Sequence, residues 1–182
     1  TFTFSGNYVK GKFQPFDSLH TKTDTIDTNN STSYNRISET GRRFSNKGGT
    51  IQYKRLYPKE GKELTADVNY NKSNFIWKGD YETQYYDANK NPIGTNILQN
   101  MASKGYNEIL SAQTDYIHPL SEKSKLETGV RGTYRNFLSK TDNFLKNDST
   151  GEFDLIKNQS ANYKFNDQVY ATYIIYSQQK NK

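Results

Sequence analysis

The chain of 182 residues carries a formal charge of +6 and contains no cysteine. It therefore has no disulfide framework and no thiolate metal site, and it lacks any run of about 18 apolar residues that could form a transmembrane helix. Only 32% of the residues are hydrophobic, yet 14% are aromatic, and the mean hydropathy is −1.03. This composition still allows strands that alternate apolar and polar residues, because only every second side chain then needs an apolar environment.

Six segments alternate in this way and predict strands. They cover residues 1–14, 44–57, 63–78, 104–117, 125–139 and 164–178. Each is longer than the usual soluble strand of about five or six residues, whereas a tilted strand that crosses a membrane needs about 9 to 11. We therefore predict an all-β fold, an antiparallel meander of about six long strands that forms part of a transmembrane β-barrel.

The first, third and fifth strands repeat one pattern. They open at Phe2, Leu64 and Leu126, at a constant spacing of 62 residues, and each continues to an Asn-Tyr or Thr-Tyr pair. The tyrosines of these pairs, Tyr8, Tyr70 and Tyr134, lie toward the far ends of their strands, and Tyr57 and Tyr116 directly precede the two short turns. Aromatic residues at the two borders of an apolar wall are typical of the headgroup level of a membrane.

The connections fall into two kinds. Residues 58–62 and 118–124 are short turns that contain Pro58, Gly61 and Pro119. The other connections, residues 15–43, 79–103 and 140–163, are long and rich in polar residues. This asymmetry is typical of an outer-membrane barrel with short periplasmic turns and long extracellular loops.

The alternation assigns residues to two predicted faces. The lipid-facing residues would be Leu64, Ala66, Val68, Leu126, Val130, Val169 and Ala171, and the lumen-facing residues would be Thr65, Asp67, Asn69, Glu127 and Arg131. On this assignment, Val68→Arg should cost about 2–4 kcal/mol near the membrane midplane, while Asn69→Arg should be nearly neutral.

Candidate ligand-binding residues lie in the second long loop. Trp77, Tyr81, Tyr85 and Tyr86 stand among polar residues, and such aromatic rings can stack on sugars or on a protein ligand. The alternative is that this segment extends the third strand, where aromatic residues pair across neighbouring strands.

Residue patterns for other chemistries are weak. The histidines are His20 and His118, in a loop and a turn, and no acidic pair is placed for acid–base chemistry, so we expect no enzymatic activity. Asp87, Asn89 and Asn91 have the spacing of calcium ligands, but Pro92 follows where glycine is required; we interpret this segment as a turn. We expect no metal and no cofactor.

Nucleic-acid binding is also not expected, although the chain is basic. A phosphate-binding groove needs cations on one face, and here only Arg42, Arg43 and Lys47, and separately Lys54 and Arg55, stand close in the sequence. We interpret the cations as a solvated surface.

Residues 112–130, AQTDYIHPLSEKSKLETGV, resemble the "AQ-x-DY-x-HPL…SKLE-x-G" hairpin of the outer-membrane β-barrel protein family related to TonB-dependent receptors. Residues 53–68 are similar to the preceding hairpin of that family, and residues 166–173, NDQVYATY, are similar to its "ENVYAAY" strand. The resemblance extends over about residues 44 to 178. It implies a many-stranded barrel in the bacterial outer membrane that imports scarce ligands.

The resemblance also implies parts that the sequence does not contain, namely a plug and an energy-coupling box. Six strands cannot close a membrane barrel, for which about eight are the minimum. We therefore expect residues 1–182 to be a single segment of an outer-membrane β-barrel whose plug and remaining strands are absent, an excerpt or a processed product of a longer protein. The expected partners are outer-membrane lipid and, through the parent chain, a periplasmic energy-coupling protein and a surface lipoprotein.

Two alternatives stay open at this point. The chain could be a complete small outer-membrane barrel with an adhesin or structural role, which would need two further strands within residues 15–43 and 79–103. It could instead be a soluble β-sandwich that binds glycans through Trp77 or Tyr86.

Overall fold

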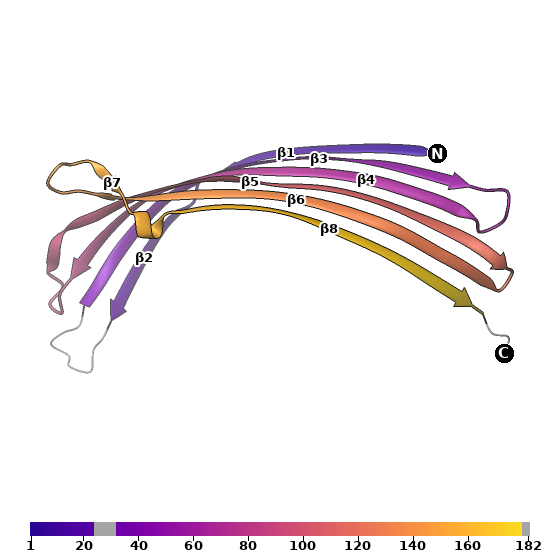
Figure 1. Ribbon diagram of the computed structural model, residues 1–182. Coiled ribbons are helices and arrows are strands. Elements are labelled where there is room, and N and C mark those ends of the chain that lie inside the picture. The colour runs from indigo at the N-terminus through magenta and orange to yellow at the C-terminus, as the bar shows by residue number, and fades with distance from the viewer. Residues whose placement is uncertain (24–31, 180–182) are drawn as a thin grey trace.

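The computed structural model describes residues 1–23 and 32–179, which form one antiparallel sheet of eight strands (Figure 1). The strands are β1 (Phe2–Phe13), β2 (Phe16–Thr23), β3 (Thr32–Leu56), β4 (Glu63–Tyr86), β5 (Pro92–Ser121), β6 (Ser124–Lys146), β7 (Phe153–Leu155) and β8 (Ala161–Gln178). A single turn of 3₁₀ helix, Lys157–Gln159, precedes β8. The predicted all-β antiparallel meander is confirmed.

The eight strands occupy six positions across the sheet. β1 and β2 pair one after the other with the same side of β3, so that they form one strand interrupted at Gln14 and Pro15. Proline has no N–H to donate to a ladder, but its carbonyl still accepts a hydrogen bond from the Thr40 amide at 3.1 Å. β7 and β8 likewise share one side of β6.

The sheet is a single curved layer (Figure 1). Among the described residues, β1 pairs only with β3, and β8 pairs only with β6, so the sheet is not closed. The predicted alternative of a soluble sandwich is wrong, because a sandwich consists of two packed sheets. None of the described helices has the length and apolarity that crossing a membrane would require.

Two short turns lie at one end of the sheet. Between β3 and β4, the Lys62 amide donates to the Lys59 carbonyl at 3.1 Å, and Gly61 has a φ of +73°, which glycine adopts without strain. Between β5 and β6 the turn is tighter than predicted, because β5 continues to Ser121, whose hydroxyl lies 2.7 Å from that of Ser124.

The predicted long loops fold mostly as extensions of the strands. β4 continues to Tyr86 and β5 begins at Pro92, so only residues 87–91 connect them, and the prediction of a loop over 79–103 is wrong in its bounds. β6 similarly extends to Lys146, beyond the predicted start of a loop at residue 140. These extensions add length to existing strands and no further position to the sheet. Part of the predicted loop 15–43, residues 24–31, lies outside the described residues.

Candidate functional site: the two faces of the sheet

Directly opposite residues of neighbouring strands point to the same face of a sheet, so the strand register defines two faces. One row across the sheet contains Phe4, Ile51, Val68, Ala112, Gly132 and Tyr170. The next row on this face contains Phe2, Tyr53, Ala66, Thr114, Val130 and Thr172. We call the half of this face that lies nearer the short turns the apolar band.

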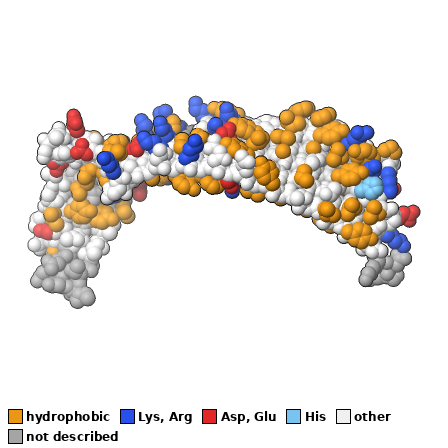
Figure 2. Space-filling model, viewed as in Figure 1, with side chains coloured by type: hydrophobic (Ala, Val, Ile, Leu, Met, Phe, Trp, Pro, Cys, Tyr) orange, Lys and Arg blue, Asp and Glu red, His pale blue; other side chains and the backbone are white. Residues whose placement is uncertain are grey.

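The apolar band is exposed to an unusual degree. Phe4 is 70%, Val130 53% and Tyr170 77% exposed, and no hydrophobic side chain among the described residues is buried. Figure 2 shows the hydrophobic side chains spread over the convex surface toward the short turns. Because a soluble protein rarely exposes a continuous apolar surface of this extent, the band requires an apolar environment outside the chain.

Tyrosines border the apolar band. On the side away from the short turns, Tyr70 and Tyr134 share one row with Leu110, and Tyr8 lies in the row above. Toward the short turns, Tyr57 packs edge-on against Tyr116, with ring centroids 6.4 Å apart. Between Leu126 and Tyr134 the strand advances about 27 Å, or about 20 Å along the axis of a barrel with tilted strands, close to the height of the lipid-facing wall of such barrels.

The opposite face, here the polar face, carries a hydrogen-bonded network. The Thr50 hydroxyl donates to Asn69 at 2.7 Å, and Asn69 in turn donates to Asp67 at 2.6 Å. Further along, Tyr173 donates to Asp115 at 2.7 Å. The register places all the predicted lumen residues on this face: Thr65, Asp67, Asn69, Glu127 and Arg131. Such a network satisfies its members without burial in a core.

Two residues of the predicted lipid-facing set lie on the polar face. Ala171 pairs with Arg131 and Val169 pairs with Thr133, so grouping them with Val130 is wrong. The cause is the composition of β8, which is apolar on both faces between Val169 and Tyr176, so that its alternation does not indicate a direction. Leu64, Ala66, Val68, Leu126 and Val130 do share one face.

Beyond the polar network, β3 and β4 carry a ladder of aromatic and basic side chains on the polar face. The Arg42 guanidinium lies 3.8 Å from the ring centroid of Trp77, and that of Arg36 lies 4.6 Å from the ring of Tyr81. The ring of Tyr85 packs against Tyr34, with centroids 5.5 Å apart. These are cation–π and aromatic pairs across one hairpin.

Three of the four predicted ligand-binding aromatics therefore lie together, as strand residues and not in a loop. Tyr86 lies on the opposite face, where its hydroxyl accepts a hydrogen bond from Asn35 at 3.5 Å. The indole Nε1 of Trp77 is buried and has no hydrogen-bond partner among the described residues. Arg42 covers one face of the indole.

Sequence reasoning did not find the arginines of this ladder, because each is separated from its aromatic partner by the β3–β4 turn. The turn sets the register that brings Arg42 opposite Trp77. The alternation of residues within one strand carries no information about this register. The one available signal is that Arg42 and Trp77 are equally distant from the turn, whereas Arg36 lies opposite Thr83, two residues beyond Tyr81.

The predicted turn at Asp87 is confirmed at the β4–β5 tip. The Asp87 carboxylate accepts hydrogen bonds from the amides of Asn91 at 2.7 Å and Asn89 at 2.9 Å, and from the Asn91 side chain at 3.1 Å. These bonds, led by those from Asn91, lower the pKa of Asp87. No group of three or more metal-ligating His, Asp or Glu side chains occurs in the part of the chain that the structure describes.

In the half of the sheet nearer the short turns, the apolar band on one face and the hydrogen-bonded network on the other have the construction of a transmembrane β-barrel wall. The model of the outer membrane protein beta-barrel family matches residues 55–182, and the chain belongs to this family. Its location is the bacterial outer membrane. No curated protein matches the chain.

Proposed function

We propose that the chain is a section of the wall of an outer-membrane β-barrel receptor that takes up ligands in the manner of TonB-dependent receptors. The observation that carries this proposal is the chemical difference between the two faces. The apolar band would contact lipid, and the polar face would line the lumen. The proposed role is non-enzymatic.

The open edges of the sheet support the proposal of a larger barrel. The backbone groups on the outer side of β1 and β8 have no ladder partner among the described residues, and unpaired backbone groups are costly within a membrane. Further strands would pair with both edges and close the wall. The alternative of a complete small barrel has less support, because residues 79–86 and 92–103 lengthen β4 and β5 and do not form additional wall positions.

The inner surface has the features of a ligand path. Near the short turns it carries carboxylates, amides and hydroxyls, among them Asp67, Asn69 and Asp115. Farther from the turns it carries the ladder of Trp77 and Tyr81 with their arginines. A ligand with both polar and flat apolar parts would meet the aromatic residues first and the polar network next. The proposed partners are outer-membrane lipid, a periplasmic energy-coupling protein and a surface lipoprotein.

Fractionation of cells that express the full-length protein tests the proposal. Membrane and soluble fractions are run on a gel with and without boiling, because folded barrels migrate differently from unfolded ones. We expect a large band in the outer membrane that shifts on heating. A large band confined to the soluble fraction would contradict the proposal, and a heat-shifting band near the 21.0 kDa of this chain would favour the small complete barrel.

A further inference from the structure

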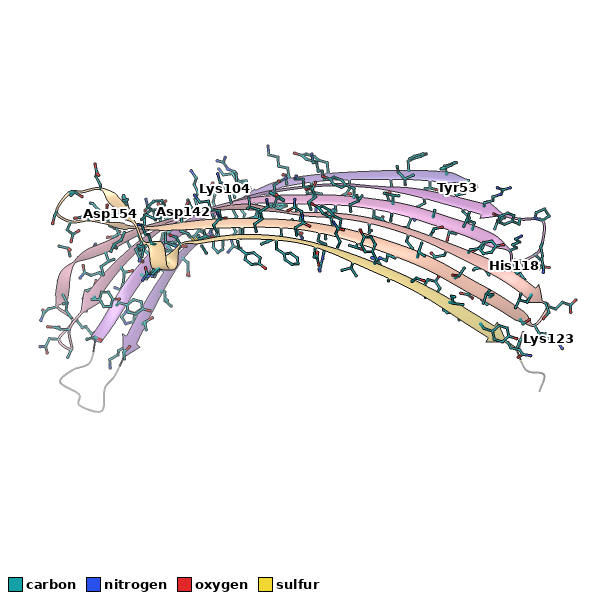
Figure 3. All side chains as sticks on the ribbon, viewed as in Figure 1. Tyr53, Lys104, His118, Lys123, Asp142 and Asp154 are labelled. Atoms are coloured by element: carbon teal, nitrogen blue, oxygen red, sulfur yellow. The ribbon has the colours of Figure 1, made fainter. Side chains whose placement is uncertain are left out.

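Basic side chains gather on the same face as the apolar band, immediately beyond its tyrosine border. The three rows next to Tyr70 and Tyr134 contain Lys10, Lys12, Arg43, Lys47, Lys72, Lys104, Lys140 and Lys164. We call this set the basic band. Figure 2 shows Lys and Arg side chains on the convex surface over the middle of the strands, next to the hydrophobic area, and Figure 3 places Lys104 there, far from His118 and Lys123 near the turns.

The cations of the basic band are close to one another. Lys47 lies directly opposite Lys72, Lys12 opposite Arg43, and Lys104 opposite Lys140. Like charges at directly opposite positions destabilise a sheet. Anions from outside the chain that lie among the cations would offset this repulsion.

The carboxylates on this face balance only part of the charge. In the three rows of the basic band, Glu108 is the one acidic residue among the described positions, and it pairs with Lys72 at 3.4 Å. Lys140 pairs with Asp142 of the next row at 2.9 Å. Lys10, Lys12, Arg43, Lys47, Lys104 and Lys164 all belong to exposed positions of the sheet.

The polar face at the same levels has a different character. Its cations there are Arg135, which pairs with Asp167, and Arg42, which lies over Trp77. A merely solvated hairpin would carry cations on both faces alike. The accumulation on one face therefore indicates an anionic partner on the outside of the wall.

The position of the basic band identifies this partner. It follows the apolar band on the side away from the short periplasmic turns, which is the level of the outer-leaflet headgroups if the apolar band spans the membrane. Cations at that level interact with anionic headgroups. We propose that the basic band binds the phosphate groups of the outer-leaflet glycolipid. This inference rests on the proposed function, since it requires the apolar band to contact lipid.

Binding of lipid A to the full-length protein in nonionic detergent tests the inference. The probes are bis-phosphorylated lipid A, the same lipid after removal of its phosphates, and inorganic phosphate. The band variant combines Lys12→Gln, Arg43→Gln and Lys104→Gln. The control variant combines Lys90→Gln, Lys146→Gln and Lys157→Gln, which remove the same charge from the outer ends of the hairpins.

We expect the unchanged protein and the control variant to bind phosphorylated lipid A at least tenfold more tightly than the dephosphorylated lipid. The band variant should lose at least tenfold of its affinity, because each cation near an anionic surface contributes up to about fivefold. Added salt should weaken the binding. Equal affinities of the band variant and the control would overturn the inference, and so would inorganic phosphate that displaces the lipid at equal concentration.

The heat-shift assay separates this inference from the proposed function. If every variant stays in the outer membrane and shifts on heating, but phosphorylated lipid A shows no preference, only the inference about the basic band fails. If the unchanged protein neither fractionates with the membrane nor shifts on heating, the proposed function fails and the basic band cannot meet lipid.

Discussion

Arginine substitutions at the neighbouring positions Val68 and Asn69 test which face of the sheet contacts lipid. Val68 is 42% exposed and lies in one row with Ile51 and Ala112. It is about 7 Å along the strand from Tyr70, so a long arginine could reach partly toward the headgroup level. An arginine on the lipid face costs about 2–4 kcal/mol at the midplane and less near the border. We expect about 2–3 kcal/mol for Val68→Arg.

Asn69→Arg is the matched control. This substitution loses the hydrogen bonds of Asn69 with Thr50 and Asp67, a loss of about 1 kcal/mol, which the new cation beside Asp67 partly offsets. Urea titration of the full-length protein in lipid vesicles, followed by gel mobility without boiling, measures both free energies of unfolding. Equal costs, or a greater cost at Asn69, would refute the assignment of the faces.

Three further predictions follow from the register, the glycine contacts and the hairpin tip. Val169→Arg should change the free energy of unfolding by less than about 1 kcal/mol, because the new side chain would lie on the polar face beside Asp167 and Thr133. Ile174→Arg in the apolar band should cost about 2 kcal/mol in the same urea titration. A greater cost at Val169 than at Ile174 would mean that Val169 faces lipid. Gly129→Ala should cost about 1–3 kcal/mol, because a Cβ at this position would collide with the Asp115 carboxylate and the Tyr173 ring. Gly6→Ala is the matched control and should not destabilise the protein, because a Cβ there would lie 3.7 Å from the Gly48 carbonyl oxygen. The amides of Asn89 and Asn91 should keep their native NMR shifts at any pH above the ordinary pKa of an aspartate. They should lose these shifts only as the pH falls through the lowered pKa of Asp87, because protonation of its carboxylate removes the hydrogen bonds that stabilise the turn. A change of the shifts at or above the ordinary pKa would contradict the hydrogen-bonded turn.

The amphipathic parts of the strands could be predicted from the sequence because their two faces differ chemically. Leu64, Ala66 and Val68 alternate with polar residues, and the structure places them on one face as predicted. The outer parts of the strands could not be predicted in this way. Lys78 and Asp80 are polar on the same face as Ile76, whereas Trp77 and Tyr81 lie on the other face. The apolar side of the alternation therefore changes face along β4, and the pattern of the inner half does not predict the outer half.

Contacts between neighbouring strands are the second feature that could not be predicted from the sequence. Arg42 and Trp77, or Lys104 and Lys140, become neighbours only through the register of a hairpin. A scattered distribution of cations along the sequence thus becomes a continuous basic band on the sheet. The same limit explains Val169 and Ala171, because the direction of β8 follows from its pairing with β6 and not from its own uniformly apolar sequence.

The alternation of environments along β6 is the most direct test of the central claim, that this sheet is a membrane wall with one lipid face and one aqueous face. The chain contains no cysteine, so a cysteine placed at Leu126, Glu127, Val130, Arg131 or Thr133 is its single thiol. Each variant is made in the full-length protein in vesicles, with any cysteine outside this chain replaced by serine. A hydrophilic thiol reagent should label positions 127, 131 and 133 rapidly and positions 126 and 130 slowly, and a fluorophore at 126 or 130 should be quenched by brominated lipid. Equal labelling at all five positions would contradict the account.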